Sequence, residues 1–236
     1  MPTNLFSKIV PHIFPQSCLL CGNPGDFATR FCSACYQELP FNHHACRGCA
    51  LPLPPGTPAE TLCGQCQKCA QTFDSALTAL RYEAPTSRLI SALKFNHQLH
   101  LSTPLARLLI ARLGKIDNPP DRILPVPLHP IRLKQRGFNQ AVELARIVSR
   151  HFAIPLDLHS VQRMRNTQAQ SDLKEADRQR NLRNAFRMRD SVRGLKLAIL
   201  DDVITTSATA RELGRTLKQA GAARVDVWAI ARTVRS

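Results

Sequence analysis

Residues 197–210 read LAILDDVITTSATA, and this stretch decides the fold of the 236-residue chain. An apolar run ends in two adjacent acids, four hydroxyl residues follow within seven positions, and a helical pattern then begins. This order predicts a buried strand, a tight hydroxyl-lined loop and a helix N-terminus. Such a loop offers backbone amides and the positive end of the helix dipole to a phosphate monoester. Carboxylates one step earlier can bind sugar hydroxyls or Mg²⁺, so the stretch predicts a sugar-phosphate site.

The predicted contacts divide between the strand end and the loop. Asp201 and Asp202 are the candidate ligands of the sugar hydroxyls or the metal. The loop that would hold the phosphate consists of Thr205, Thr206, Ser207, Ala208 and Thr209. A simpler interpretation of the hydroxyls is helix capping, because Thr209 and Glu212 have the spacing of a capping box. The acid pair favours the phosphate site, since two acids just past a buried strand need a cation or hydroxyl partner.

The same segment resembles the phosphoribosyl pyrophosphate signature of type I phosphoribosyltransferases, whose usual form is DD-x-x-T-T-G-x-T. Both acids and the three threonines match, and Ala208 fills the variable position. Ser207 stands where the signature has glycine, a residue that adopts positive φ at little cost. The resemblance implies a type I phosphoribosyltransferase-like α/β fold with a mostly parallel sheet. It also implies that phosphoribosyl pyrophosphate binds together with Mg²⁺.

Alternating strand and helix patterns surround this stretch, in a domain predicted to span residues 73–236. Strands are expected at 75–82, 122–126, 196–200 and 224–231, and helices at 87–93, 103–113, 140–150 and 208–220. Such alternation predicts a mostly parallel sheet that binds its ligand at the carboxyl ends of the strands.

Two basic segments belong at that ligand-binding edge. In VPLHPIRLKQRGFNQA (126–141), Arg132, Lys134 and Arg136 precede Gly137 in a predicted loop, where cations would neutralise a pyrophosphate. The segment 163–189 is arginine-rich and lacks an apolar pattern. It is interpreted either as a solvated helix and loop or as a flap whose arginines face a nucleic-acid backbone. The candidate nucleic-acid contacts are Arg163, Arg165, Arg178, Arg180 and Arg183.

All nine cysteines lie between residues 18 and 69, in a module predicted to span residues 1–72. Eight of them form CxxC pairs: Cys18/Cys21, Cys32/Cys35, Cys46/Cys49 and Cys63/Cys66. Two CxxC turns complete a tetrahedral Zn²⁺ site, so we expect a double zinc ribbon with two structural ions. Consecutive or interleaved pairs would both satisfy this count, and Cys69 would replace Cys66 or remain free. A disulfide framework would require an oxidising compartment, and no export signal is recognised.

The formal net charge of +15 is concentrated in one part of the chain. Residues 1–72 contribute +1 and residues 73–236 contribute +14. This asymmetry favours a polyanionic partner for the second domain. No apolar run approaches the length of a membrane span, so the sequence predicts a cytoplasmic protein that does not insert into membranes.

The order of these elements resembles the ComF family, also called ComFC or GntX-like. The CxxC module, the RGFNQ segment, a T-x-x-Q…R-x-x-N pattern and the DDVITTSAT loop follow one another as in that family. The third pattern is met by Thr167, Gln170, Arg178 and Asn181. Membership implies a role in natural competence, handling incoming single-stranded DNA in the cytoplasm, with other competence or recombination proteins as further candidate partners.

Two other functions stay open at this point. One is an active phosphoribosyltransferase that uses an unidentified base or amine as acceptor, although the sequence shows no acceptor pocket. The other is an adaptor protein that binds its partners through the cysteine module.

Overall fold

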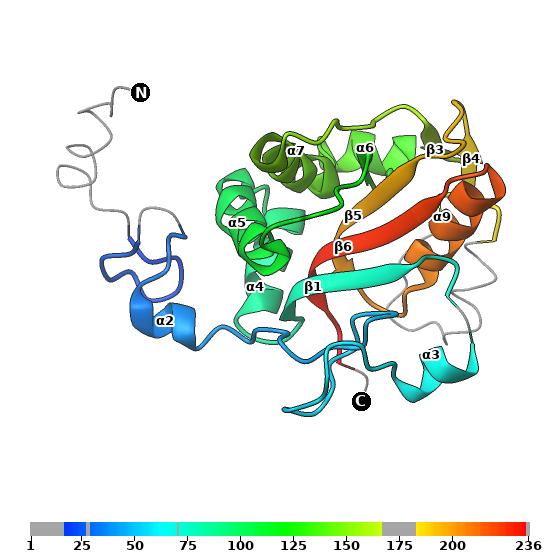
Figure 1. Ribbon diagram of the computed structural model, residues 1–236. Helices are drawn as coiled ribbons and strands as arrows, with labels where there is room; N and C mark the ends of the chain where they lie inside the picture. Colours follow the sequence, from blue (N-terminus) through cyan, green and yellow to red (C-terminus); the bar gives the residue numbers. More distant parts are fainter. Residues whose placement is uncertain (1–16, 27–28, 70, 167–182, 235–236) are drawn as a thin grey trace, which may run out of the picture.

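A parallel sheet forms the centre of the computed structural model, which describes residues 17–26, 29–69, 71–166 and 183–234. Within these residues the sheet has four strands in the order β1-β6-β5-β2, all parallel to their neighbours (Figure 1). The strands are β1 (Ser75–Arg81), β2 (Arg122–Pro125), β5 (Lys196–Ile204) and β6 (Arg224–Arg232). The predicted α/β class with a parallel sheet is therefore confirmed.

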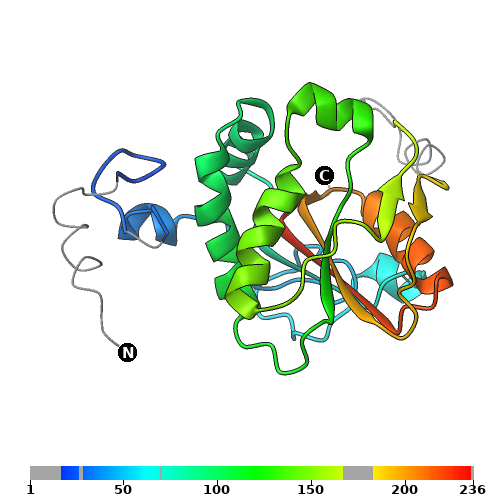
Figure 2. The same cartoon turned by 90° about the horizontal axis from the view of Figure 1, so that it is seen from above.

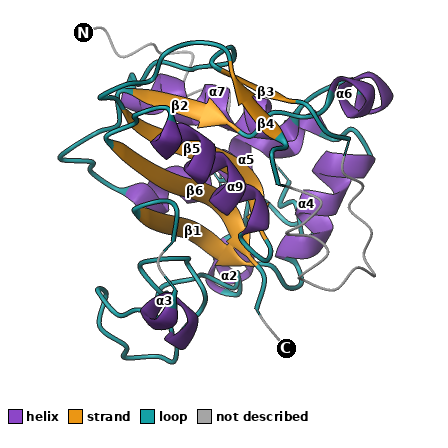
Figure 3. Ribbon diagram, turned by 90° about the vertical axis from the view of Figure 1, so that its right-hand side faces the viewer, coloured by secondary structure: helices purple, strands orange, loops and turns teal. Residues whose placement is uncertain are grey.

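Helices cover both faces of the sheet (Figure 2). One face carries α5 (Ser102–Leu113) and α7 (Gln140–Phe152), and the other carries α9 (Ala208–Gln219), as Figure 3 shows with α9 in front of the strands. The short helix α4 (Thr86–Phe95) follows β1, and a 3-10 turn η1 (Leu99–Leu101) leads into α5. Side chains of β5 alternate between two buried clusters, so the strand is apolar on both faces.

Three short elements form in segments where the sequence predicted no helix or strand. They are α6 (Pro130–Arg136), β3 (Val161–Arg163) and β4 (Phe186–Met188). The prediction of a loop around Arg132, Lys134 and Arg136 is wrong, because these residues lie on α6. The His129 side chain accepts the Ile131 N–H, Pro130 begins the helix, and Gly137 ends it at φ +77°.

The cysteine module packs along the outer edge of β1. It contains α2 (Ser33–Gln37) and α3 (Gly64–Lys68), and in Figure 1 the segment between them passes below β1. The Asn42 N–H donates to the Ala79 carbonyl at 2.9 Å, and the Arg81 N–H donates to the Pro40 carbonyl at 2.7 Å. The module therefore covers backbone groups that an edge strand otherwise leaves unpaired.

None of the helices in the described ranges has the length and apolarity that crossing a lipid bilayer requires.

Candidate functional site

Two clusters of four thiols occupy the N-terminal module. The first consists of Cys18, Cys21, Cys32 and Cys35, and the second of Cys46, Cys49, Cys63 and Cys66. Within each cluster the sulfur atoms lie within 4.8 Å of one another, so consecutive pairs share a site and the interleaved arrangement is excluded. Cys69 is exposed and belongs to neither cluster. Four thiolates close the coordination shell of Zn²⁺, which suits a structural ion and leaves no position for catalysis.

The loop between β5 and α9 leads into a helix N-terminus that is buried and has no side-chain cap. Ser207 is the N-cap of α9, with φ +61° and ψ 6°, and makes no side-chain capping bond. By contrast, the Asn139 side chain caps α7 by accepting the Ala141 N–H at 3.0 Å. The first N–H groups of α9 lack intrahelical partners by geometry and so remain available to an anion.

Ser207 itself carries an unpaired hydroxyl. The residue is 5 % exposed, and its Oγ has no hydrogen-bond partner among the described residues. A buried polar group without a partner costs about 1–3 kcal/mol. The serine lines a small pocket together with Asp201, Thr205 and Thr209. The orphaned hydroxyl and the uncapped helix therefore both indicate a ligand that accepts hydrogen bonds at this loop.

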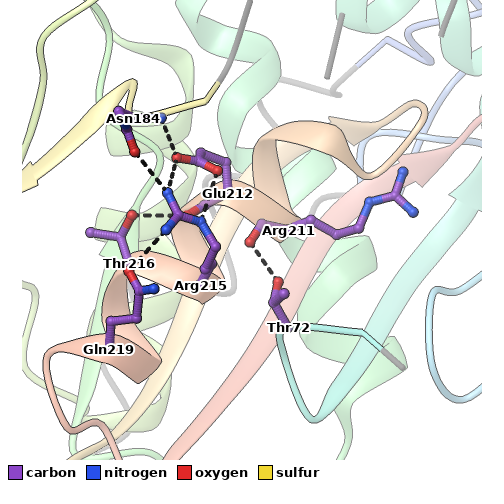
Figure 4. Close-up of polar contacts among 7 residues, drawn as sticks. All are labelled: Thr72, Asn184, Arg211, Glu212, Arg215, Thr216 and Gln219. Atoms are coloured by element: carbon purple, nitrogen blue, oxygen red, sulfur yellow. Dashed lines mark hydrogen bonds and ion pairs between the residues drawn. The ribbon is translucent and has the colours of Figure 1, made fainter. Parts of the chain in front are cut away.

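The predicted capping box between Thr209 and Glu212 does not form. The Glu212 carboxylate accepts the Asn184 N–H at 2.6 Å and pairs with the Arg215 guanidinium at 2.6 Å (Figure 4). Arg215 also donates to the Asn184 Oδ1 at 3.2 Å. These contacts attach the segment leading into β4 to α9, and they leave the helix N-terminus free of Glu212.

The two adjacent acids have different surroundings, because neighbouring residues of a strand point to opposite faces. Asp202 is 2 % exposed and pairs with the Lys94 ammonium at 2.6 Å. Burial opposes ionisation of Asp202, but Lys94 outweighs it and holds the pKa of this carboxyl below its ordinary value. Burial and the Asp202 charge raise the pKa of Asp201, in the loop pocket, to about 8. A bound cation would therefore favour the ionised form of Asp201.

Cations from three elements lie around this acid pair, because Lys94 belongs to α4 and arginines of α6 and β3 add to it. Arg136 on α6 interacts electrostatically with Asp202, and Arg163 on β3 interacts with Asp201. Burial lowers the pKa values of both arginines, and the nearby charge of Arg132 lowers them further. Of the remaining predicted residues, Lys134 is exposed, and Gly137 ends α6 with open space where a Cβ would lie. Sequence reasoning missed Lys94, because no local pattern distinguishes it from an ordinary surface lysine.

The predicted nucleic-acid contacts are partly described. Arg163 is half-buried, with its guanidinium 5.7 Å from the centre of the Phe186 ring. Arg165 and Arg183 are exposed. Arg178 and Arg180 lie outside the described residues, as do Thr167, Gln170 and Asn181. Sequence reasoning gave no separate role to three further exposed arginines near β3 and β4, which are Arg146, Arg187 and Arg189.

A larger cavity of about 430 Å³ lies between α6, α7, β2 and β3. Its lining includes the apolar residues Leu128, Phe138 and Val142 and the polar residues Arg146, Arg163, Glu143, Gln162 and Arg189. The sequence did not reveal it, because the unpredicted elements α6 and β3 form its walls. Its volume lies within the usual range for small-molecule pockets.

Comparison with known proteins gives matches over both parts of the chain. The double zinc ribbon domain matches residues 9–74. The chain is 36% identical over 228 residues to DNA utilization protein YhgH of Shigella flexneri, covering 93% of this chain and 98% of the relative. It is 35% identical over 178 residues to competence protein F of Haemophilus influenzae, covering 72% of this chain and 78% of the relative. Glutamine phosphoribosylpyrophosphate amidotransferase from B. subtilis, solved with ADP and GMP, aligns at 21% identity with a TM-score of 0.36, over 53% of this chain and 25% of that chain.

Proposed function

This chain belongs to the family of DNA utilization protein YhgH and competence protein F, the ComF family, and from that premise we propose that it is a competence factor. In this proposal it handles single-stranded DNA in the cytoplasm and binds phosphoribosyl pyrophosphate at the loop between β5 and α9. Competence or recombination proteins are candidate partners for the same role.

The unpaired Ser207 hydroxyl, next to the uncapped α9, is the observation that carries the ligand assignment. The 5′-phosphate would accept hydrogen bonds from this hydroxyl, from the neighbouring threonines and from the first amides of the helix. Asp201 would bind the ribose hydroxyls or Mg²⁺, whose preferred ligands are oxygens. Asp202 is already paired with Lys94, so its contribution is to hold that cation in place.

The pyrophosphate would lie against the guanidinium groups of α6 and β3. Arg136 and Arg163 both interact with the acid pair, and Arg132 interacts with both of them. Planar guanidinium groups bind phosphate oxygens through paired N–H donors. A ligand that carries phosphates at both ends of a ribose therefore matches the charges on both sides of Asp201.

Calorimetric titration with phosphoribosyl pyrophosphate and Mg²⁺ tests this assignment. Asp201→Asn should abolish the binding heat while the fold is retained. Asp117→Asn removes a carboxylate from an exposed ion pair with Lys115 and should leave the titration unchanged. Absence of binding heat in the wild-type protein would reject the ligand.

Arginine charge supports the proposed DNA contact more strongly than base stacking does. Phe186 is buried under Arg163, which leaves it unavailable to a base. Phe95 is 65 % exposed and has the Arg136 guanidinium 5.5 Å from its ring centre, so it is the aromatic candidate near the site. Binding that depends mainly on phosphate contacts is steeply weakened by salt.

Fluorescence anisotropy with a labelled oligothymidylate tests the DNA contact. We expect affinity to fall about tenfold or more between about 50 mM and about 200 mM salt. Replacing Arg187 and Arg189 by Gln should weaken binding and flatten this salt dependence, whereas replacing Arg47, at the zinc module's ion pair with Glu60, should not. An affinity that does not change with salt would reject a backbone contact.

An active phosphoribosyltransferase is the second candidate, and the cavity of about 430 Å³ beside Arg163 favours it. This cavity offers a place for an acceptor base or amine next to the proposed ribose site. Release of pyrophosphate with one member of a panel of bases and amines would support turnover. Binding of phosphoribosyl pyrophosphate without release for any acceptor would support a ligand-responsive pocket instead.

A further inference from the structure

A buried arginine connects the second zinc cluster to the β5–α9 loop. Arg232 is the last residue of β6 and is 1 % exposed. Its Nε donates to the carbonyl of Cys49 at 3.0 Å, and its Nη1 donates to the carbonyls of Ile204, at 3.2 Å, and Thr205. One guanidinium group therefore spans two parts of the chain that lie more than 150 residues apart in sequence.

On the zinc side, the carbonyl that Arg232 contacts belongs to a metal-binding turn. Cys49 contributes a thiol to the second cluster, and both Cys46 and Cys49 are buried. The next carbonyl, of Ala50, accepts from the Asn42 side chain at 2.9 Å, and Asn42 also donates to Thr78 on β1 at 2.8 Å. Two buried polar side chains, Asn42 and Arg232, thus hold adjacent carbonyls of this turn against β1 and β6.

On the loop side, three successive carbonyls point toward guanidinium groups. Arg232 binds those of Ile204 and Thr205, and Arg211 donates to that of Thr206 at 2.6 Å. Arg211 also contacts the C-terminal end of the cysteine module, because its carbonyl accepts the Thr72 hydroxyl at 2.5 Å (Figure 4). In a planar trans peptide the C=O and the following N–H point in opposite directions. The N–H groups of Thr206 and Ser207 therefore point away from these arginines.

We propose that Arg232 is a positioning residue through which metal binding at Cys46, Cys49, Cys63 and Cys66 controls the anion-binding conformation of the β5–α9 loop. With zinc bound, the Cys49 carbonyl is fixed and the guanidinium is held where it orients the loop. Without zinc, the turn is released, the buried guanidinium loses an acceptor, and the loop amides lose their common direction. The inference deepens the proposed function and rests on it only where ligand binding is the readout.

The ligand-free protein tests the coupling directly, by hydrogen exchange of the amides in residues 203–209. Cys66→Ser weakens the second zinc cluster, and Cys35→Ser is the matched change in the first. We expect Cys66→Ser to speed exchange of these amides about tenfold, the scale of ordinary coupling between sites, and Cys35→Ser to leave it unchanged. Equal effects of the two variants, or no effect of either, would overturn the proposal.

Arg232→Lys tests the connecting residue. Lysine keeps the charge but lacks the planar fork that reaches acceptors on two sides. Two zinc ions per chain should still be bound by elemental analysis, while exchange in residues 203–209 rises as in Cys66→Ser. In the double variant, Cys66→Ser should add little to Arg232→Lys, because both break one connection. Additive effects would mean that zinc acts on the loop by another route and would overturn the assignment to Arg232.

Titration with phosphoribosyl pyrophosphate and Mg²⁺ then separates the two proposals. If the wild-type protein binds, Cys66→Ser and Arg232→Lys should each weaken binding about tenfold, and Cys35→Ser should not. If the wild-type protein does not bind, the proposed ligand fails. The hydrogen-exchange comparison still decides the coupling in that case, because it uses no ligand.

Discussion

At position 207, a serine adopts a backbone conformation that is usual for glycine. Its φ of +61° places it in the left-handed region, where a side chain costs about 1–2 kcal/mol. Its hydroxyl is also buried without a partner among the described residues. A residue that combines backbone strain with an unpaired polar group indicates a binding site, because both costs are retained where a ligand offsets them.

Ser207→Ala should separate stability from binding. Removing the unpaired hydroxyl should raise the free energy of unfolding by about 1 kcal/mol, and should weaken phosphoribosyl pyrophosphate binding about tenfold or more. Urea unfolding and calorimetric titration measure the two effects. Ser102→Ala is the matched control, since Ser102 is a second buried serine whose Oγ lacks a described partner, and it should raise stability without affecting binding. A Ser207→Ala protein with unchanged affinity would remove the hydroxyl from the site.

Asp157 should make stability depend on acid pH. Its buried carboxylate accepts the Ser160 hydroxyl at 2.6 Å and the Ser160 N–H at 2.9 Å, and Arg122 lies at 3.3 Å. Burial opposes ionisation, but these donors outweigh it and lower the pKa of Asp157. Because the folded-state pKa is below the unfolded value of about 3.9, the stabilisation is present above that pH and is lost as pH falls.

The variant Asp157→Asn should therefore be less stable than the wild type by about 1–3 kcal/mol near neutral pH. The difference between the two proteins should shrink below about pH 4, where the wild-type carboxyl becomes protonated. Urea unfolding of both proteins at each pH measures this difference. Zinc loss at acid pH affects both proteins equally, so its effect on stability cancels in the difference. Asp190→Asn, at an exposed position, is the control and should change the free energy of unfolding little near neutral pH. A difference that stays constant with pH would contradict the role of the charge.

Replacing Glu212 by Gln should weaken the contact between α9 and the β3–β4 pair. The charged carboxylate accepts from both Asn184 and Arg215 (Figure 4), and hydrogen bonds to charged groups contribute about 1.5–3 kcal/mol. We expect faster hydrogen exchange in residues 183–188 with little change in the sheet. Glu143→Gln, which removes a more exposed pair with Arg146, is the control. Equal exchange in wild type and Glu212→Gln would show that core packing alone holds the pair.

Elements with strong local patterns could be predicted from the sequence. The strand expected at 75–82 is β1 (Ser75–Arg81), and the helix expected at 140–150 is α7 (Gln140–Phe152). Both have an apolar period, and α7 has a good capping residue in Asn139. By contrast, α6 is too short for an apolar period, although Pro130 and Gly137 mark its ends. The strands β3 and β4 have three residues each and depend on long-range pairing.

In the candidate site too, the contiguous part could be predicted from the sequence, whereas the partners that come from remote elements could not. Its loop follows from a contiguous pattern, and the structure shows that Ser207 has the positive φ that suits the glycine of that pattern. The partners Lys94 and Arg232 come from remote strands and helices, and their roles depend on which carboxylate or carbonyl they meet in the fold. The different surroundings of Asp201 and Asp202 follow from the strand continuing through them to Ile204, whereas the sequence suggested that it ended before them.

At the scale of the whole molecule, the cysteine module and the α/β domain share one core. Phe31 and Leu39 of the module are buried in the same cluster as Leu80, Ile90 and Ile230. The module also pairs with the backbone of β1, through Asn42 and Pro40. The boundary predicted between residues 72 and 73 therefore marks a change in composition, and we expect the two parts to unfold together.

Phe31→Ala tests this cooperativity, because the side chain is 1 % exposed. Phe31 directly precedes Cys32 of the first zinc cluster, so the zinc content of the variant is measured as well. Losing a buried phenylalanine costs about 3–5 kcal/mol, a large share of the about 5–15 kcal/mol that stabilises a typical protein. The single tryptophan, Trp228 on β6, reports the state of the sheet by its fluorescence. If the two parts unfold together, Phe31→Ala lowers the urea midpoint measured at Trp228, while Leu62→Ala, at an exposed position of the module, has little effect.

A Phe31→Ala protein that retains its two zinc ions and unfolds in two steps, with the Trp228 transition unchanged, would instead show an independent module. The shared core of Phe31, Leu80 and Ile90 favours the first outcome.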